Sequence, residues 1–221
     1  MNYYIGLSLA SSSGMDSGVA VIDEDNNLIT LDKLYKMDDV IYFFENFNSL
    51  KNSKICVSVP YDRTMLEGKW RIISKPYQPV ATNKNIPNRE NWTQRHSNRG
   101  SEYFKSLTER GVTVNRFDIY ISRQSMHLNS CYKDRSPADC KFLQQALKYE
   151  WGLYSLPANM MPMSHMEAIL GAILAKENEK NPQKIRTLYN FKGLDVIDLK
   201  DNLTSSNDVY NFEKELVSTI G

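Results

Sequence analysis

YYIGLSLASSSG (residues 3–14) is an apolar run that ends in a polar, glycine-containing turn. Its aromatic and aliphatic content predicts a buried β-strand over residues 3–10. A second apolar stretch at residues 19–23 leads into the polar sequence DEDNN, which is typical of a tight turn, and a third strand is expected at residues 28–34. The start of the chain therefore predicts a three-stranded antiparallel meander.

The next segment predicts a helix followed by a strand. Apolar residues recur at spacings of three and four over residues 37–50, and Asp38 and Asp39 stand in the first turn, where the helix dipole favours acidic side chains. Residues 55–59 are apolar on both faces, as expected of a central parallel strand. A strand, a helix and a strand in this order predict a right-handed crossover and an α/β fold with a mixed sheet.

Residues 61–99 interrupt this order. They contain three of the eight prolines and show no clear period, so we expect a long loop inserted into the domain. We assign residues 1–180 to one domain and residues 181–221 to a C-terminal extension packed on or beside it. The later elements expected are a helix at 100–111, a strand at 112–121, a helix from Ser136 to about Trp151, a helix from Ser164, and weak strands at 185–189 and 194–199.

Both late helices begin with a capping signal. Ser136 precedes Pro137 and stands three residues before Asp139, and Ser164 stands three residues before Glu167, which is the spacing of a capping box. The second helix then presents a stripe of small residues that would let its backbone lie close against a sheet. The stripe consists of Ala168, Gly171, Ala172 and Ala175.

Composition excludes several classes of protein. The formal net charge is +1, so any basic surface must be local, and no apolar run approaches the roughly 18 residues that span a bilayer. The three scattered cysteines fit neither a disulfide framework nor a zinc site. With no recognisable secretory signal, we expect a cytoplasmic protein without a membrane partner.

Three motifs at these element ends resemble a known family. They are Gly6-Leu7-Ser8 at the end of the first strand, Ser58-Val59-Pro60 at the end of the fourth, and Glu167 with the small-residue stripe on the late helix. Their order resembles the predicted RNase H-like nucleases, an uncharacterised bacterial family related to the RuvC group of Holliday-junction resolvases. Arg95, Arg99 and Glu102 loosely resemble the family's arginine and acidic residue at a helix start.

The resemblance implies a ribonuclease H-like mixed sheet with helices on both faces, and metal-dependent hydrolysis of phosphodiesters. In that family, carboxylates from two strand ends and one helix start would hold one or two Mg²⁺ or Mn²⁺ ions, about 3.5–4 Å apart. Here Ser8 and Ser58 stand where the family has strand carboxylates, and only Glu167 keeps its acidic group. Because hard cations need anionic oxygen ligands, the two serines predict weakened metal binding.

Two other aspartates could restore an acidic site. Asp16 lies in the turn after the first strand, and Asp62 lies four residues past Ser58. We take Glu167, Asp62 and Asp16 as candidate catalytic residues, and Glu167 with Asp62 as candidate metal ligands. The alternatives are ordinary turn residues for both aspartates and capping alone for Glu167. His165, beside Glu167, is either a ligand or base or a surface or interface histidine.

The segment from Arg63 to Arg99 is strongly basic. It holds eight lysines and arginines against two glutamates, and aromatic residues lie among the charges. Such interleaving suits a surface that binds branched, hybrid or single-stranded nucleic acid, with Arg63, Trp92, Arg95 and Arg99 as binding candidates. The alternative is a solvated loop whose aromatic residues cover the edge of the core.

Two main functions remain open on this evidence, ahead of a small-molecule enzyme of the same broad superfamily, such as a phosphotransferase, because the sequence lacks a phosphate-binding loop. The first is a nucleic-acid-binding nuclease with a degenerate or altered acidic site. The second is a catalytically inactive module of the same fold that binds a protein, a nucleotide or an anion, or that forms a homo-oligomer. The methionine-rich stretch at residues 159–166 indicates flexible packing or a hydrophobic partner surface.

Overall fold

The computed structural model describes residues 2–10, 15–59 and 89–200, with the backbone alone for residues 89–97. Its centre is a seven-stranded sheet in the order β3-β2-β1-β4-β5-β7-β6. The strands are β1 Tyr3–Ser8, β2 Ser17–Ile22, β3 Leu28–Leu34, β4 Ser53–Ser58, β5 Thr113–Phe117, β6 Ile185–Phe191 and β7 Leu194–Leu199.

The sheet is mixed, as the sequence predicts. β1, β2 and β3 form the antiparallel meander, and β4 and β5 continue in parallel from β1. The two late strands join the same sheet, because β7 pairs in parallel with β5 and β6 pairs antiparallel with β7. Residues 185–199, which we assigned to an extension, therefore supply one edge of the central sheet.

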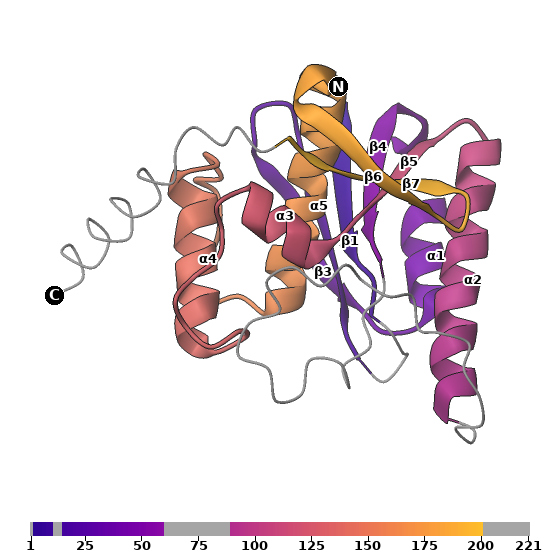
Figure 1. The fold of residues 1–221 in the computed structure, drawn as a ribbon. Coiled ribbons are helices and arrows are strands. Elements are labelled where there is room, and N and C mark those ends of the chain that lie inside the picture. The colour runs from indigo at the N-terminus through magenta and orange to yellow at the C-terminus, as the bar shows by residue number, and fades with distance from the viewer. Residues whose placement is uncertain (1, 11–14, 60–88, 201–221) are drawn as a thin grey trace, which may run out of the picture.

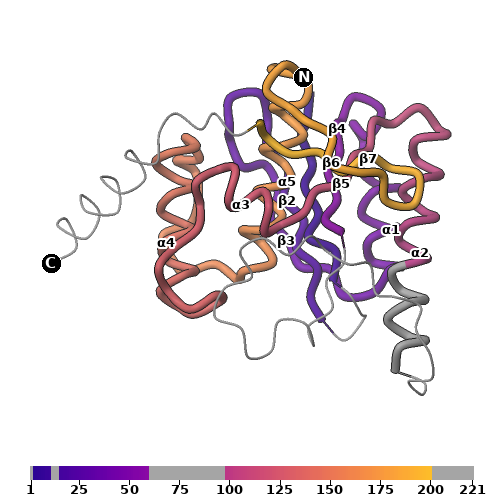
Figure 2. Tube along the Cα trace, viewed as in Figure 1, coloured from indigo at the N-terminus to yellow at the C-terminus, as the bar shows by residue number. Residues whose placement is uncertain are grey.

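Helices cover both faces of this sheet. Figure 1 shows α1 and α2 together on one side and α3, α4 and α5 on the other, and the trace in Figure 2 gives the same arrangement. The helices are α1 Met37–Glu45, α2 Arg89–Glu109, α3 Ile119–Ser125, α4 Pro137–Tyr149 and α5 Met163–Lys180, with short 3₁₀ helices at Leu50–Asn52 and Pro182–Lys184.

Side chains alternate between the two faces of each strand, so the hydrophobic core consists of two clusters, one on each face of the sheet. Tyr4 packs into the cluster that contains the inner faces of α4 and α5, whereas Ile5 and Leu7 pack into the cluster that contains α1 and α2. Successive side chains of a strand point to opposite faces, so one apolar run serves both cores. Ser8 shares the face of Tyr4, which directs its hydroxyl toward α5.

The small-residue stripe places α5 directly on β1. A Cβ atom built on Gly6 would lie 1.8 Å from the carbonyl oxygen of Ala168, and one built on Gly171 would lie 2.7 Å from the ring of Phe117. Glycine at both positions therefore lets a helix backbone approach the strands without an intervening side chain. This close approach brings the start of α5 to the carboxyl end of β1.

Three element boundaries differ from the sequence-based prediction by four residues or more. β5 ends at Phe117 because the Asp118 side chain caps α3 by accepting hydrogen bonds from the backbone N–H groups of Tyr120 and Ile121. The second helix begins at Arg89, so residues 89–99 belong to α2 and not to the inserted loop. α1 ends at Glu45, and a 3₁₀ turn follows it.

In the part of the chain that the structure describes, no helix has both the length and the apolar character needed to cross a bilayer.

Candidate functional site at the ends of β1 and β4

Ser8 and Glu167 meet at the carboxyl end of β1. The Ser8 hydroxyl donates a hydrogen bond to Glu167 Oε2 over 2.8 Å, although 159 residues separate the two in sequence. Glu167 lies in the second turn of α5 and is only 4% exposed. The structure therefore brings together a strand end and a helical carboxylate that the sequence motifs pair.

Ser58 lies at the end of the neighbouring strand, β4, but its hydrogen bonds are to the backbone and not to Glu167. Its hydroxyl accepts a hydrogen bond from the backbone N–H of Leu9 over 2.9 Å, which ties the end of β4 to the end of β1. Its carbonyl oxygen accepts a hydrogen bond from the buried guanidinium of Arg116 over 3.0 Å. Ser58 thus supports the backbone at this site.

Arg135 completes the site, and sequence reasoning missed it. Its guanidinium forms an ion pair with Glu167 through Oε1, so Arg135 and Ser8 together engage both carboxylate oxygens. The backbone of Arg135 adopts a left-handed conformation with φ of 59°, and its N–H donates to Asp139 Oδ2 over 2.9 Å. Such a conformation is uncommon outside glycine and is often found at functional sites.

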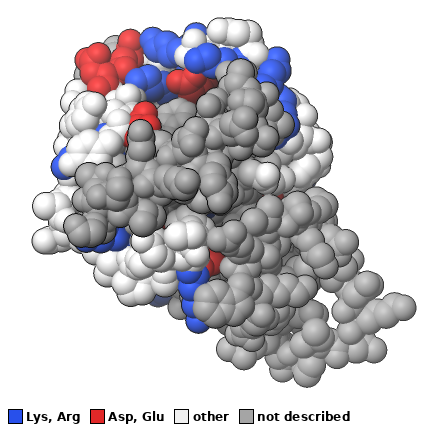
Figure 3. All heavy atoms as spheres, turned by 60° about the vertical axis from the view of Figure 1, so that its left-hand side comes forward, with Lys and Arg blue, Asp and Glu red and all other residues white. Residues whose placement is uncertain are grey.

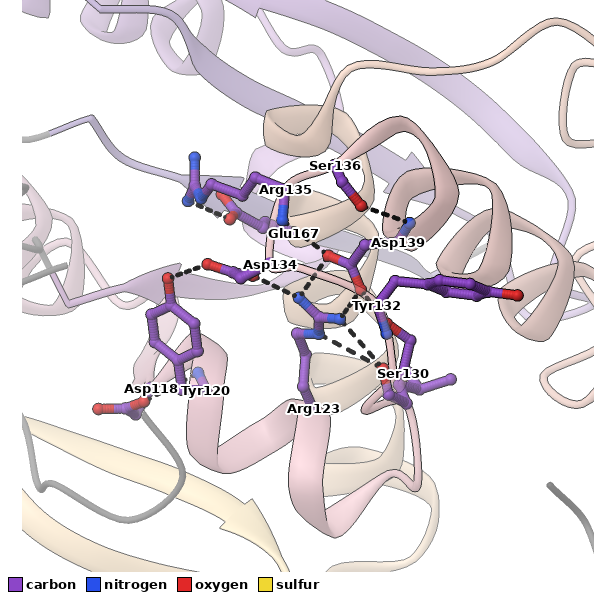
Figure 4. Close-up of polar contacts among 11 residues, drawn as sticks. Asp118, Tyr120, Arg123, Ser130, Tyr132, Asp134, Arg135, Ser136, Asp139 and Glu167 are labelled. Atoms are coloured by element: carbon purple, nitrogen blue, oxygen red, sulfur yellow. Dashed lines mark hydrogen bonds and ion pairs between the residues drawn. The ribbon is translucent and has the colours of Figure 1, made fainter. Parts of the chain in front are cut away.

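A buried polar network holds the loop that carries Arg135 (Figure 4). Arg123 donates to Asp139 Oδ1 over 2.7 Å and to Asp134 Oδ1 over 3.1 Å. The Tyr120 hydroxyl donates to Asp134 Oδ2 over 3.0 Å, and the Ser130 hydroxyl donates to Asp139 Oδ1 over 2.6 Å. Ion pairs and charge-assisted hydrogen bonds therefore tie α3, α4 and the connecting loop together beside Glu167.

The environment of these groups shifts their protonation equilibria. Burial raises the pKa of the Glu167 carboxyl, and the charge of Arg135 and the hydrogen bond from Ser8 oppose that increase. The carboxylate of Glu167 in turn raises the pKa of Arg135. Burial also acts to raise the pKa of Asp139, but its contacts with Arg123, Ser130 and the Arg135 backbone together lower that pKa.

The described residues at this site do not fit a Mg²⁺ or Mn²⁺ ion. Both oxygens of Glu167 already have partners, and the two strand ends contribute neutral hydroxyl groups. Within residues 2–10, 15–59 and 89–200, no group of three histidine, cysteine or acidic side chains has the arrangement of a metal site. Asp62, the second proposed ligand, lies outside the described residues.

Asp16 contacts the start of α5. It accepts a hydrogen bond from the Ser164 hydroxyl over 2.7 Å and pairs with Lys33 over 3.5 Å. Burial acts to raise its pKa, but the hydrogen bond from Ser164 and the charge of Lys33 contribute to a net decrease. Among the described contacts, Asp16 thus anchors α5 to β3.

The capping interpretation of Glu167 is wrong. α5 begins at Met163 with Pro162 as its N-cap, and no side chain caps it, so Ser164 is already inside the helix. By contrast, Ser136 does cap α4, since its hydroxyl accepts the hydrogen bond from the Asp139 N–H. The burial of Glu167 therefore reflects its contacts with Ser8 and Arg135.

The other binding candidates lie apart from Glu167 or outside the described residues. His165 is half-buried, and burial followed by the charge of Lys33 lowers its pKa. Arg99, on α2, pairs with exposed Asp38 of α1. Trp92 and Arg95 lie in α2 with undescribed side chains, and Asp62 and Arg63 fall within residues 60–88, which the structure does not describe.

Neither a scan against family profiles nor a search of curated proteins found a match. The contacts at the ends of β1 and β4 and the charges around them are therefore the features that indicate a function.

Replacing Ser8 by alanine tests the contact with Glu167. We expect the free energy of unfolding to fall by about 1.5–3 kcal/mol, because the variant loses a buried hydrogen bond to a charged group. Urea denaturation measures this change. Ser125→Ala removes another buried serine donor to a carboxylate, Asp198, and is the matched control. In a background that carries Glu167→Gln, the decrease in the free energy of unfolding caused by Ser8→Ala should be smaller, whereas the decrease caused by Ser125→Ala should be unchanged.

Proposed function

We propose that this chain is an RNase H-like module that binds nucleic acid without cleaving it. The order of an antiparallel meander followed by parallel strands supports the RNase H-like part of the proposal. The position of Glu167 supports it too, because a helix packed on the first strand carries the acidic group to the carboxyl end of that strand.

The observation that carries the loss of cleavage is the ion pair between Arg135 and Glu167. A hydrolytic centre of this kind needs several carboxylates free to bind divalent cations. Here the single remaining carboxylate is buried and already neutralised by a guanidinium from the same chain. Among the described residues, a metal ion would have to displace Arg135, and the two strand ends would offer it the hydroxyl groups of Ser8 and Ser58.

Local charge supports nucleic acid as the ligand. Residues 63–99 carry eight basic and two acidic side chains, a local charge of +6, in a chain of net charge +1. Arg99 is half-exposed, and its partner Asp38 is more exposed still. Because exposed ion pairs are worth little, a phosphate group can replace Asp38 at small cost.

Metal-dependent hydrolysis is the second candidate. The contact between Ser8 and Glu167 favours it, since this is where the family places its acidic residues. In that case Asp62, four residues past Ser58, would have to supply a carboxylate that the described residues lack.

The experiment compares binding and cleavage by the full chain. Fluorescently labelled branched, hybrid and single-stranded oligonucleotides are incubated with protein and Mn²⁺. We expect anisotropy to report binding that weakens at least about tenfold between 50 and 200 mM salt, because phosphate contacts release counterions. We expect intact oligonucleotides, and no rise in melting temperature with Mn²⁺.

Matched variants give the controls. Arg95→Ala with Arg99→Ala should weaken binding, whereas Lys51→Ala with Lys184→Ala, which removes two exposed charges elsewhere, should not. Mn²⁺-dependent cleavage that disappears in Glu167→Gln would establish the nuclease instead. If the binding affinity does not change with salt concentration, the proposal that nucleic acid is the ligand is wrong.

A further inference from the structure

A groove on the outer side of α4 takes no part in the proposed function. It has a volume of about 580 Å³ and lies between α4 and residues 157–160. The ten described residues along it include two lysines and no acidic residue, and most of the others are apolar. The lining includes Ala138, Lys141, Lys148, Tyr149, Pro157 and Met160. The groove is therefore large enough for a ligand and carries positive charge beside an apolar surface.

Gln144 holds the wall opposite α4 in place. Its Nε2 donates to the carbonyl oxygens of Pro157 and Asn159 over 2.6 and 2.9 Å. Its Oε1 accepts a hydrogen bond from the backbone N–H of Met161 over 3.0 Å. The groove is therefore preformed, and three backbone groups of its wall already have partners. An extended ligand, which binds through its backbone, would find these groups occupied, whereas a helix pairs its own backbone groups.

Two lysines give the groove a positive charge that the described residues do not neutralise. Lys141 and Lys148 stand seven residues apart, which places them on the same side of α4 and about 10.5 Å apart along its axis. Among the described ion pairs neither has an acidic partner, whereas Lys33, Lys54 and Lys180 each pair with a carboxylate. Figure 3, which brings the α4 side forward, shows the described acidic side chains gathered mostly toward the top of this face. An acidic ligand therefore complements the groove.

Large apolar side chains are exposed beside these charges. Tyr149 is 63% exposed and Met160 is 60% exposed. The ammonium group of Lys148 lies 5.9 Å from the centre of the Tyr149 ring, so charged and apolar contacts are offered side by side. Of the seven large apolar side chains that are exposed in the described residues, four lie between residues 132 and 160. Because tyrosine and methionine are enriched at protein interfaces, this surface favours a protein ligand.

We propose that the groove binds an acidic, amphipathic helix of a partner protein. The bound helix lies along α4 and places its apolar stripe on Tyr149 and Met160. Two acidic side chains seven residues apart face Lys141 and Lys148, because seven residues span the same distance of about 10.5 Å in both helices. This interaction does not depend on the proposed binding of nucleic acid, for which the basic residues at 63–99 are the candidates.

A synthetic peptide tests the proposal on the full chain. The probe is a fluorescein-labelled peptide of about 15 residues, with leucines at spacings of three and four and two glutamates seven residues apart. We expect saturable binding by anisotropy, and amide chemical-shift changes in ¹⁵N-labelled protein that centre on α4 and residues 157–160. A second peptide, with lysines in place of the two glutamates, should bind about tenfold more weakly, because two attractions become two repulsions.

Charge exchange and a matched control identify the groove. Lys141→Glu with Lys148→Glu should weaken binding of the glutamate peptide about tenfold and strengthen binding of the lysine peptide. Lys51→Glu with Lys184→Glu changes the net charge by the same amount at two exposed lysines outside the groove lining, and should alter neither affinity. Melting curves report whether each variant is folded.

Three results would overturn the proposal. They are absence of peptide binding, equal affinities for the glutamate and lysine peptides, and displacement of the peptide by an oligonucleotide that binds Lys141→Glu with Lys148→Glu more weakly than the wild type. The last result would assign the lysines to a surface for nucleic acid. We expect instead that this variant keeps the wild-type affinity for oligonucleotides, so failure of either proposal leaves the other intact.

Discussion

Arg135→Ala is expected to lower the free energy of unfolding by about 2–3 kcal/mol, because it leaves the buried carboxylate of Glu167 without its counter-charge. The loss is smaller than for a fully buried pair, since the Arg135 side chain is 34% exposed and its charge is partly screened by solvent. Urea denaturation of the two proteins gives the value.

The loss should depend on pH. Burial already raises the pKa of Glu167, and removing the opposing charge of Arg135 raises it further. A carboxyl whose pKa is raised in the folded state binds more protons there than in the unfolded chain, so stability is lost as pH rises from the unfolded pKa through the folded one. The difference in the free energy of unfolding between Arg135→Ala and the wild type should therefore be smaller at about pH 5 than at about pH 8.

A matched ion pair provides the control. Arg186 is 36% exposed and pairs over 2.9 Å with Asp198, which is fully buried. Arg186→Ala should also be destabilised, but only the Arg135→Ala loss should be largely recovered by Glu167→Gln, since an amide is less costly to bury than an unpaired carboxylate. Additive losses in Arg135→Ala with Glu167→Gln would show that the ion pair contributes nothing to stability.

Gly6→Ala should cost at least about 3 kcal/mol, because the added methyl group overlaps the backbone of α5 and not a movable side chain. The new Cβ would lie 1.8 Å from the carbonyl oxygen of Ala168 and 2.3 Å from the backbone nitrogen of Ala172. The helix must move away from β1, which also lengthens the contact between Ser8 and Glu167. Thermal and urea denaturation measure the loss.

Gly111→Ala is the control for this substitution. Gly111 has φ of +85°, and a Cβ built there meets nothing within 4 Å. Its replacement should cost only the backbone strain of about 1–2 kcal/mol. If Gly6→Ala lowers the free energy of unfolding no more than Gly111→Ala does, the packing of α5 does not depend on its close approach to β1.

The sequence predicted those strands and helix starts that are determined by residues close together in the chain. The meander follows from apolar runs and a polar turn, and the cap at Ser136 follows from a serine placed before Pro137. Asp118 carried a similar signal for α3, but the apolar residues that follow it read as a continuing strand. The start of α2 at Arg89 was missed because residues 89–99 are polar and lack a clear apolar period.

The ion pair of the candidate site could not be predicted in the same way. Arg135 lies 32 residues before Glu167, and its left-handed backbone has no signature in an arginine. Its position depends on Arg123 and Asp139, whose pairing is set only once α3 and α4 have packed. The family motifs could place Ser8 and Glu167 together, but they could not reveal which cation neutralises the carboxylate.

The parallel pairing of β7 with β5 has a consequence for synthesis of the protein. Arg116 of β5 faces Val196 of β7, about 80 residues later in the chain. While the nascent polypeptide emerges from the ribosome, that margin of β5 has no strand beside it until the last segment of the sheet is released. Such an uncovered margin can capture another extended chain, so translation speed and chaperone access should influence the yield of folded protein.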